Sequence, residues 1–203
     1  MHIFQNEFSF LNEFFRSTPC TIPIILFAIY FANKNMFIFY LILGWFFMDY
    51  IGVGIFKNII CKPIGDYITS NYGIIDFPII GRFKRPDGAK NCGCFYVSET
   101  NYATSEGMPS GHSILVGFVA VFMYNYIIDE YNINHKYKPY IFILTFLFIL
   151  YTMYSRVLIN CHTTQQTILG ALIGSLCGYY YYKYVSHNNK KINNKTNNKT
   201  KNK

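Results

Sequence analysis

The sequence is poor in charged residues. Asp, Glu, Lys and Arg make up only 14% of its 203 residues, whereas a soluble domain usually carries about 25%. Hydrophobic residues make up 52% and aromatic residues 20%. The net charge is +8, but seven of the 18 basic residues follow position 182, so the rest of the chain is nearly neutral. This composition excludes intrinsic disorder before the last residues, argues against a nucleic-acid binder, and favours a one-domain membrane protein.

Metal-binding and targeting patterns are also missing. The six cysteines form no Cys-x-x-Cys pair and no Cys/His spacing of a zinc site, so we expect no metal and no cofactor. Cys92 and Cys94 are too close for an ordinary bridge to each other, but either could reach Cys61, which leaves the redox state open. The N-terminus has no basic region and is not expected to be a signal peptide.

Apolar runs that approach the roughly 20 residues needed to cross a bilayer predict an all-α, multi-pass bundle of about five transmembrane spans. The expected spans cover about 19–32, 36–60, 109–128, 139–158 and 163–184. The segment 61–108 is polar and long for a connecting loop, and long loops are often functional.

The two ends of the chain differ from the predicted bundle. Apolar residues near the N-terminus recur every three or four positions, at Phe4, Phe8, Leu11 and Phe15. This spacing predicts a helix that either packs in the bundle or lies in the membrane interface. The Lys/Asn-rich tail, 187–203, is expected to be disordered. We therefore expect a membrane domain over 1–186, with a motif-bearing core at about 50–182.

Basic residues gather on one side of the predicted bundle. They are Lys57, Lys62, Arg82, Lys84, Arg85, Lys90 and Arg156. Charge near hydrocarbon is costly, so such a cluster indicates an anionic ligand. A helix that begins at Pro109 would leave the N–H groups of Ser110, Gly111 and His112 without helical acceptors, which makes an anion site. His162 lies just before the last predicted span, four residues from Gln166.

Three of these segments resemble the motifs of the type 2 phosphatidic acid phosphatase superfamily. Pro109-Ser110-Gly111-His112 is similar to its second motif, Ser155-Arg156-x5-His162 to its third, and Arg85-Pro86 to the end of its first. The resemblance covers about 50–182. The superfamily includes lipid phosphate phosphatases, glucose-6-phosphatases and polyprenyl diphosphate phosphatases, and is similar in mechanism to vanadium haloperoxidases. It implies a membrane phosphatase that needs no metal and acts on a lipid phosphate or diphosphate.

Two positions depart from the family pattern. The family lysine that precedes Arg-Pro by seven residues is replaced here by Pro78. The sequence after Lys57 resembles the start of the same motif, so we expect Lys57 to be the phosphate lysine, with Lys84 as the alternative. Most members carry Asp where this chain has Gln166. Dolichyl diphosphatases and glucose-6-phosphatases also resemble this chain in having glutamine there. The segments Ser155-Arg156-Val157-Leu158-x3-His162-Thr163 and Gly107-Met108-Pro109-Ser110 resemble the dolichyl type most closely.

The resemblance implies a role for each candidate residue. His162 would attack phosphorus and form a phosphohistidine, with Gln166 holding its other ring nitrogen. His112 would protonate the leaving oxygen and then activate water. The phosphoryl oxygens would be neutralised by Lys57, Arg85, Ser110, Gly111 and Arg156.

The distribution of basic residues also predicts how the protein is oriented in the membrane. The positive-inside rule places the basic tail in the cytoplasm and His162 on the extracytoplasmic or lumenal face, in the endoplasmic reticulum if the cell is eukaryotic. The expected partners are a lipid phosphate and the membrane, not a nucleic acid. A phosphatase of a soluble ester and a non-catalytic scaffold are the alternatives. Asp49, an acid inside the second span, is either functional or held by a structural hydrogen bond.

Overall fold

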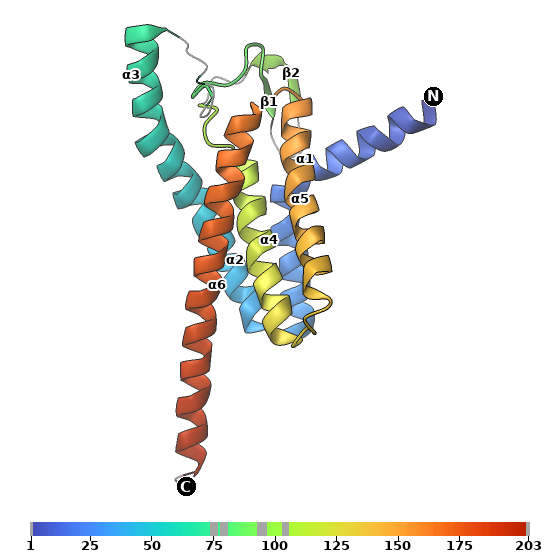
Figure 1. Cartoon of the computed structure of the whole chain (residues 1–203), viewed down its shortest axis with the longest axis vertical. Coiled ribbons are helices and arrows are strands. Elements are labelled where there is room, and N and C mark those ends of the chain that lie inside the picture. The colour runs from blue at the N-terminus through green and yellow to red at the C-terminus, as the bar shows by residue number, and fades with distance from the viewer. Residues whose placement is uncertain (1, 74–76, 78–80, 93–96, 103–105, 202–203) are drawn as a thin grey trace.

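The molecule is a bundle of long helices with a cap of loops at one end (Figure 1). The computed structural model describes the backbone of residues 2–73, 77, 81–92, 97–102 and 106–201, and the side chains of 14–50, 52–73, 77, 81–89 and 106–191. The helical elements are α1 (His2–Asn33), α2 (Met36–Phe47), η1 (Met48–Gly52), η2 (Ile55–Cys61), α3 (Lys62–Tyr72), α4 (Gly111–Glu130), α5 (Lys138–Leu158) and α6 (Thr164–Lys201). The predicted all-α bundle is confirmed. A small antiparallel ribbon of β1 (Lys90–Cys92) and β2 (Val97–Tyr102) is added in the cap.

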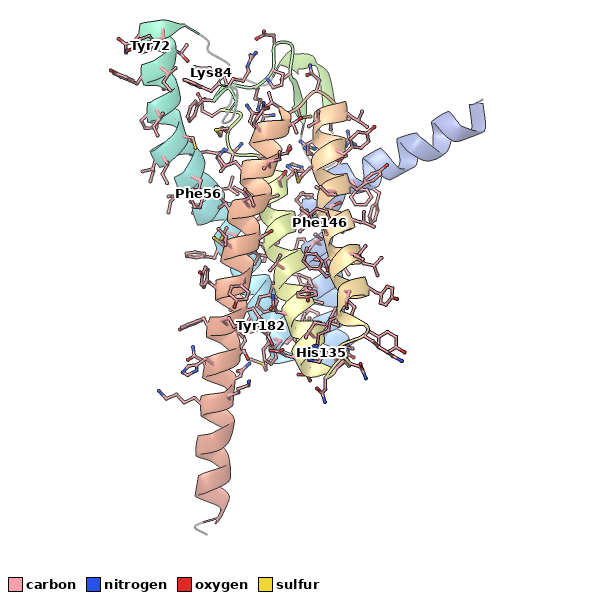
Figure 2. The ribbon with its side chains drawn as sticks, in the orientation of Figure 1. Phe56, Tyr72, Lys84, His135, Phe146 and Tyr182 are labelled. Carbon is pink, nitrogen blue, oxygen red and sulfur yellow. The ribbon has the colours of Figure 1, made fainter. Side chains whose placement is uncertain are left out.

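Four helices among the described residues are long and apolar enough to cross a membrane. They cover Phe14–Asn33, Met36–Tyr72, Gly111–Glu130 and Lys138–Leu158. The fifth expected span, 163–184, is the first half of α6 and packs in the bundle, but Gln165, Gln166 and four consecutive tyrosines make it less apolar. The outer face of α5 carries exposed apolar side chains such as Phe142, Phe146 and Leu147, as a lipid-facing helix does (Figure 2).

The N-terminal region forms one helix where a separate interfacial helix and a short span were expected. Helix α1 continues through Pro19 and Pro23, and its N-terminal part projects from the bundle (Figure 1). Phe15 packs against α5, with ring centroids 5.6 Å from Phe148 and 4.4 Å from Tyr151. The side chains of Phe4, Phe8 and Leu11 lie outside the described residues. The sequence therefore predicted the helical periodicity but not its continuity with the first span.

The second span runs much further than predicted. The helical path from Met36 passes through the π-helical segments η1 and η2 and ends at Tyr72, so the expected loop boundary at 61 was wrong. Pro63 does not stop it and lies where the π-helical segment η2 gives way to α3. Gly73 ends the helix with a φ of 79°. Helix α3 leans away from the other helices at the capped end (Figure 1).

A stripe of glycines brings α6 against α4. A Cβ added at Gly174 would meet the carbonyl oxygen of Ile114, and one at Gly178 would meet that of Phe118. Small residues at this four-residue spacing let two helix backbones approach closely in a membrane. The contact continues to the capped end, where the N–H of Ser110 donates to the carbonyl of Gln166 at 3.0 Å. It therefore sets the start of α4 beside the start of α6.

The C-terminal tail corrects another expectation. Helix α6 continues to Lys201 and extends past the bundle (Figure 1), whereas disorder was expected from residue 187. No Gly or Pro follows Gly178 in the sequence, so no helix-breaking residue interrupts the run. The side chains after Lys191 lie outside the described residues.

Candidate active site

One cavity of about 280 Å³ contains most of the predicted site residues. Six of them line it: Lys57, Arg85, Gly111, His112, Arg156 and His162. They come from η2, the loop before the ribbon, the start of α4, the end of α5 and the turn between α5 and α6. The remaining lining residues are Pro19, Cys20, Trp45, Asp49, Val53 and Leu115. Segments far apart in the sequence thus place three cations and two histidines around one space.

The turn after α5 places His162 next to Arg156. The backbone N–H groups of Cys161 and His162 both donate to the carbonyl of Arg156, at 3.0 and 3.3 Å. This tight turn passes through Asn160 with a φ of 55°, a left-handed conformation that asparagine tolerates better than most residues. Both side chains are buried, with Arg156 1% and His162 3% exposed. The third motif therefore folds into a compact unit in which its cation and its histidine share the cavity.

Gln166 fixes the orientation of the His162 ring. Its side-chain Oε1 lies 3.1 Å from Nδ1 of His162, and its Nε2 donates to the carbonyls of Arg82 and Lys84 at 2.8 Å each. Because Nε2 faces two acceptors, Oε1 is the atom that faces the histidine, and Nδ1 must carry the proton. The neutral ring then has its lone pair on Nε2.

The loop that carries Arg85 is held by its own side chains. Arg82 donates to the carbonyl of Arg85 at 2.6 Å and forms an ion pair with Asp87 at 2.7 Å. This pairing lowers the pKa of the Asp87 carboxyl, chiefly through the hydrogen bond from Arg82. Arg85 reaches across to donate to the carbonyl of Cys161 at 3.2 Å. The loop is thereby tied to the residue that precedes His162.

Ser110 stands behind the cavity and does not line it. Its Oγ accepts from the N–H of Ser113 at 3.4 Å, as a helix N-cap does, and it is fully buried. Its own N–H is occupied by the carbonyl of Gln166. Ser110 is therefore the N-cap of α4 and lies outside the cavity lining, and its contact with phosphate stays a prediction. The backbone N–H groups of Gly111 and His112 remain at the first turn, where a helix offers no internal acceptor.

The two candidate lysines occupy different surroundings. Lys57 lines the cavity, and its Nζ donates to the backbone carbonyl of Glu106 at 3.4 Å. Lys84 is outside the lining and pairs with the carboxylates of Asp66 at 3.3 Å and Glu106 at 3.9 Å. Its position at the capped end is labelled in Figure 2. Pro78, which replaces the family lysine, lies outside the described residues. The structure therefore brings Lys57, and not Lys84, to the cavity.

Burial and the surrounding cations keep His162 neutral. Its pKa lies well below the ordinary value, first because it is buried and then because Arg85, Lys57 and Arg156 are close. The hydrogen bond from Gln166 acts in the opposite direction but is the smaller effect. Burial also lowers the pKa of Arg85. A cavity with this much positive charge is stabilised by an anion, and its histidine is available as a nucleophile.

Disulfides near the cavity were not predicted. Cys20 and Cys161 are disulfide-bonded, whereas Cys61 and Cys177 are free thiols. Cys61 is a free thiol, so the bridge to it from Cys92 or Cys94 that the sequence left open is not formed. Connectivity of this kind carries no sequence signal. The sequence also gave no sign that Glu106 and Arg82 would hold the lysine and the Arg85 loop.

Comparison with known protein families shows the family of this chain. A family model described as the PAP2 superfamily matches residues 37–190, more than half of the chain. The chain belongs to the PAP2 superfamily. The match runs from α2 into α6 and includes every predicted site residue. Membership implies phosphatase activity in general terms. No curated protein and no solved structure matches the chain.

Proposed function

We propose that this PAP2 protein hydrolyses a lipid phosphate or diphosphate through a phosphohistidine on His162. The observation that carries the proposal is the buried imidazole of His162, whose Nδ1 lies 3.1 Å from Oε1 of Gln166. The lone pair on Nε2 is then the nucleophile, and it lies in a cavity with three cations. Neutral Gln stabilises the developing imidazolium less than a carboxylate would, because charged partners form the stronger hydrogen bonds.

The reaction proceeds in two displacements. In the first, Nε2 of His162 forms a bond to phosphorus while the bond from phosphorus to the leaving oxygen breaks, and His112 gives that oxygen a proton. In the second, His112 takes a proton from water as the water oxygen attacks the phosphohistidine, which releases phosphate and restores His162. Nε2 of His112 is buried and has no hydrogen-bond partner among the described residues, as a proton donor awaiting substrate would be.

Several groups around the cavity neutralise the negative charge of the phosphoryl group. Lys57, Arg85 and Arg156 line the cavity and neutralise its oxygens. The two guanidinium groups suit this task because their planar forks meet two oxygens at once. The backbone N–H groups of Gly111 and His112 add the positive end of α4. Ser110 contributes by capping that helix.

A lipid is proposed as substrate because the cavity reaches into the membrane-crossing helices. Trp45, Asp49 and Val53 line it from the second span and Leu115 from the third. A phosphate bound at the capped end would therefore have its alcohol directed along apolar helices. The similarity of Ser155-Arg156-Val157-Leu158-x3-His162-Thr163 and Gly107-Met108-Pro109-Ser110 to dolichyl diphosphatases supports a polyprenyl diphosphate as one member of this class. A soluble phosphate ester would not use these deeper lining residues.

We propose that the cavity faces the extracytoplasmic or lumenal side and the tail the cytoplasm. The basic tail supports this orientation, and so do the disulfides of Cys20 and Cys161, because disulfides persist in oxidising compartments. In a eukaryotic host the endoplasmic reticulum is the proposed location. An N-glycosylation acceptor inserted after Gly73 should be modified and the native acceptors Asn194 and Asn198 should not. If Asn194 and Asn198 were modified and the inserted acceptor were not, the protein would have the inverse orientation in the membrane.

The activity is tested by phosphate release from purified protein in detergent, without added metal. The panel contains phosphatidate, a prenyl diphosphate and a sugar phosphate, each assayed with the wild type and with His162→Ala. The proposal expects lipid substrates to be preferred and His162→Ala to be inactive. Release from the sugar phosphate alone would favour the soluble-ester alternative. No release from any substrate would favour the scaffold.

A further inference from the structure

The cavity extends well beyond the phosphate-binding cations. Four residues of the second span line it at a spacing of four, in the order Trp45, Asp49, Val53 and Lys57. They follow one another along the helical path from α2 through η1 to η2. Lys57 marks the phosphate end. Trp45 and Asp49 therefore mark a second, deeper end within the membrane-crossing part of the helix.

The deeper end holds a hydrogen-bond donor and an acceptor that phosphate chemistry does not use. The indole Nε1 of Trp45 is buried and has no hydrogen-bond partner among the described residues, and the whole side chain is only 6% exposed. Four residues further along the same helix, Asp49 also lines the cavity, and its side chain is exposed at the surface of the bundle. The described side chains include no hydrogen-bond or ion-pair partner for its carboxylate. An unpartnered donor in the lining of a cavity is costly unless a ligand supplies its partner.

The chemistry of the pair identifies the group it can bind. A second phosphate would be repelled by the Asp49 carboxylate. An ammonium group could pair with Asp49 but has no acceptor for the Trp45 N–H, and it would lie in the field of three nearby cations. A hydroxyl satisfies both partners, because its hydrogen donates to the carboxylate while its oxygen accepts from the indole N–H.

We propose that Asp49 and Trp45 form a hydroxyl-binding subsite that selects phosphates whose alcohol carries a free hydroxyl. This inference rests on the proposed function, because it concerns the alcohol part of the same substrate. Within the lipid class it favours hydroxylated lipid phosphates, such as a polyol or lysolipid phosphate, over the polyprenyl diphosphate that motif similarity alone supports. Asp49 also keeps the phosphate at the Lys57 end by repelling it from the deeper end.

The subsite is tested by binding, which does not depend on turnover. The probes are non-hydrolysable alkylphosphonates of one chain length, either unsubstituted or with a single hydroxyl at successive carbons. Their affinities for the purified full-length protein are measured by calorimetry in detergent. We expect at least one hydroxylated probe to bind roughly tenfold more tightly than the unsubstituted one, the scale of a hydrogen bond to a charged group.

Variants assign this preference to the two residues. Asp49→Leu removes the acceptor and Trp45→Phe removes the donor while keeping a ring, and each should bring the affinity ratio close to one. Asp49→Asn keeps the shape of the side chain and should lower this affinity ratio several-fold. It replaces Asp49→Leu in the test if that variant does not fold. The matched control is Tyr50→Phe, since Tyr50 is 87% exposed and outside the cavity lining. The control should keep the wild-type ratio.

The outcomes separate this inference from the proposed function. Equal affinities for all probes in the wild type, or an unchanged ratio in every folded variant, would overturn the subsite even if phosphate release is robust. Hydroxyl-dependent binding without phosphate release from any substrate would support the subsite and contradict the proposed phosphatase activity.

Discussion

The amide group of Gln166 joins two of the three family motifs. Its Oε1 lies 3.1 Å from Nδ1 of His162, and its Nε2 donates at 2.8 Å to the carbonyls of Arg82 and Lys84. Its backbone carbonyl accepts from Ser110 of the remaining motif. A single fully buried side chain with its own backbone therefore links the third motif to the other two.

Gln166→Glu should destabilise the protein although the two side chains have the same shape. The change would place a carboxylate oxygen against two backbone carbonyls that now accept hydrogen bonds, and buried unsatisfied groups of this kind cost about 1–3 kcal/mol each. Thermal unfolding in detergent should show a lower Tm than for the wild type. Thr164→Glu, at an exposed position two residues earlier, is the control. An unchanged Tm for Gln166→Glu would show that the amide orientation described above is wrong.

The activity should survive into mildly acidic solution. Because the pKa of His162 is lowered, its neutral form persists below the ordinary histidine pKa of about 6.5, and the acid limb of kcat/KM should lie below that pH. An aryl phosphate is the suitable substrate, since its good leaving group needs little help from His112.

The pH dependence of an Arg85 variant tests whether His162 is the group that titrates. Arg85 is the first of the charged groups that lower the pKa of His162. Arg85→Gln should therefore move the acid limb to higher pH while it reduces the rate. A limb that stays in place, or one that lies above pH 6.5 in the wild type, would argue that His162 is not the titrating group.

The two lysines should differ clearly in kinetics. Lys57→Ala should cost about 1–3 kcal/mol of transition-state stabilisation, the scale of a lost charged hydrogen bond. Lys84→Ala should cost less, because Lys84 lies outside the cavity lining and pairs with Asp66 and Glu106. The check is kcat/KM for both variants on one substrate. A larger loss of kcat/KM for Lys84→Ala than for Lys57→Ala would show that Lys84 is the lysine of the first motif.

Close packing of α4 and α6 should be sensitive to a single methyl group. Gly174→Ala places a Cβ against the carbonyl of Ile114, and overpacking of this kind typically costs about 1–3 kcal/mol. Gly54→Ala is the matched control, because a Cβ there meets nothing within 4 Å. We expect a lower Tm only for Gly174→Ala. Equal Tm values for the two variants would mean that the helices are not in close backbone contact.

The sequence predicted the parts of this fold that depend on local patterns. Apolar runs located the bundle helices, and Pro139 marked the start of α5 because proline suits a first helical turn. Pro63 falls in the segment 61–108 that was expected to be a loop, but it lies in the first turn of α3. The tail was read as disordered from its composition, which says little about a helix that simply continues from a packed segment.

The site was predictable where the chemistry lies in short motifs. Lys57, His112, Arg156 and His162 were chosen by motif and line one cavity. The sequence could not show that a carbonyl from α6 occupies the backbone N–H of Ser110. Long-range relationships such as the disulfides of Cys20 and Cys161, or the approach of Trp45 to the cavity, depend on how the helices pack. The four-residue glycine spacing in α6 was a readable signal that was missed.

The central claim is that His162 becomes phosphorylated during turnover. The most direct measurement is rapid quenching of the purified enzyme with a ³²P-labelled substrate, followed by mass spectrometry of the peptide that contains His162. The account predicts a base-stable, acid-labile phosphate on His162 in the wild type and none in His162→Ala. His112→Ala should retain the label longer with a good leaving group, because it cannot activate the second-step water. Label on another residue, or label that persists in His162→Ala, would contradict the account.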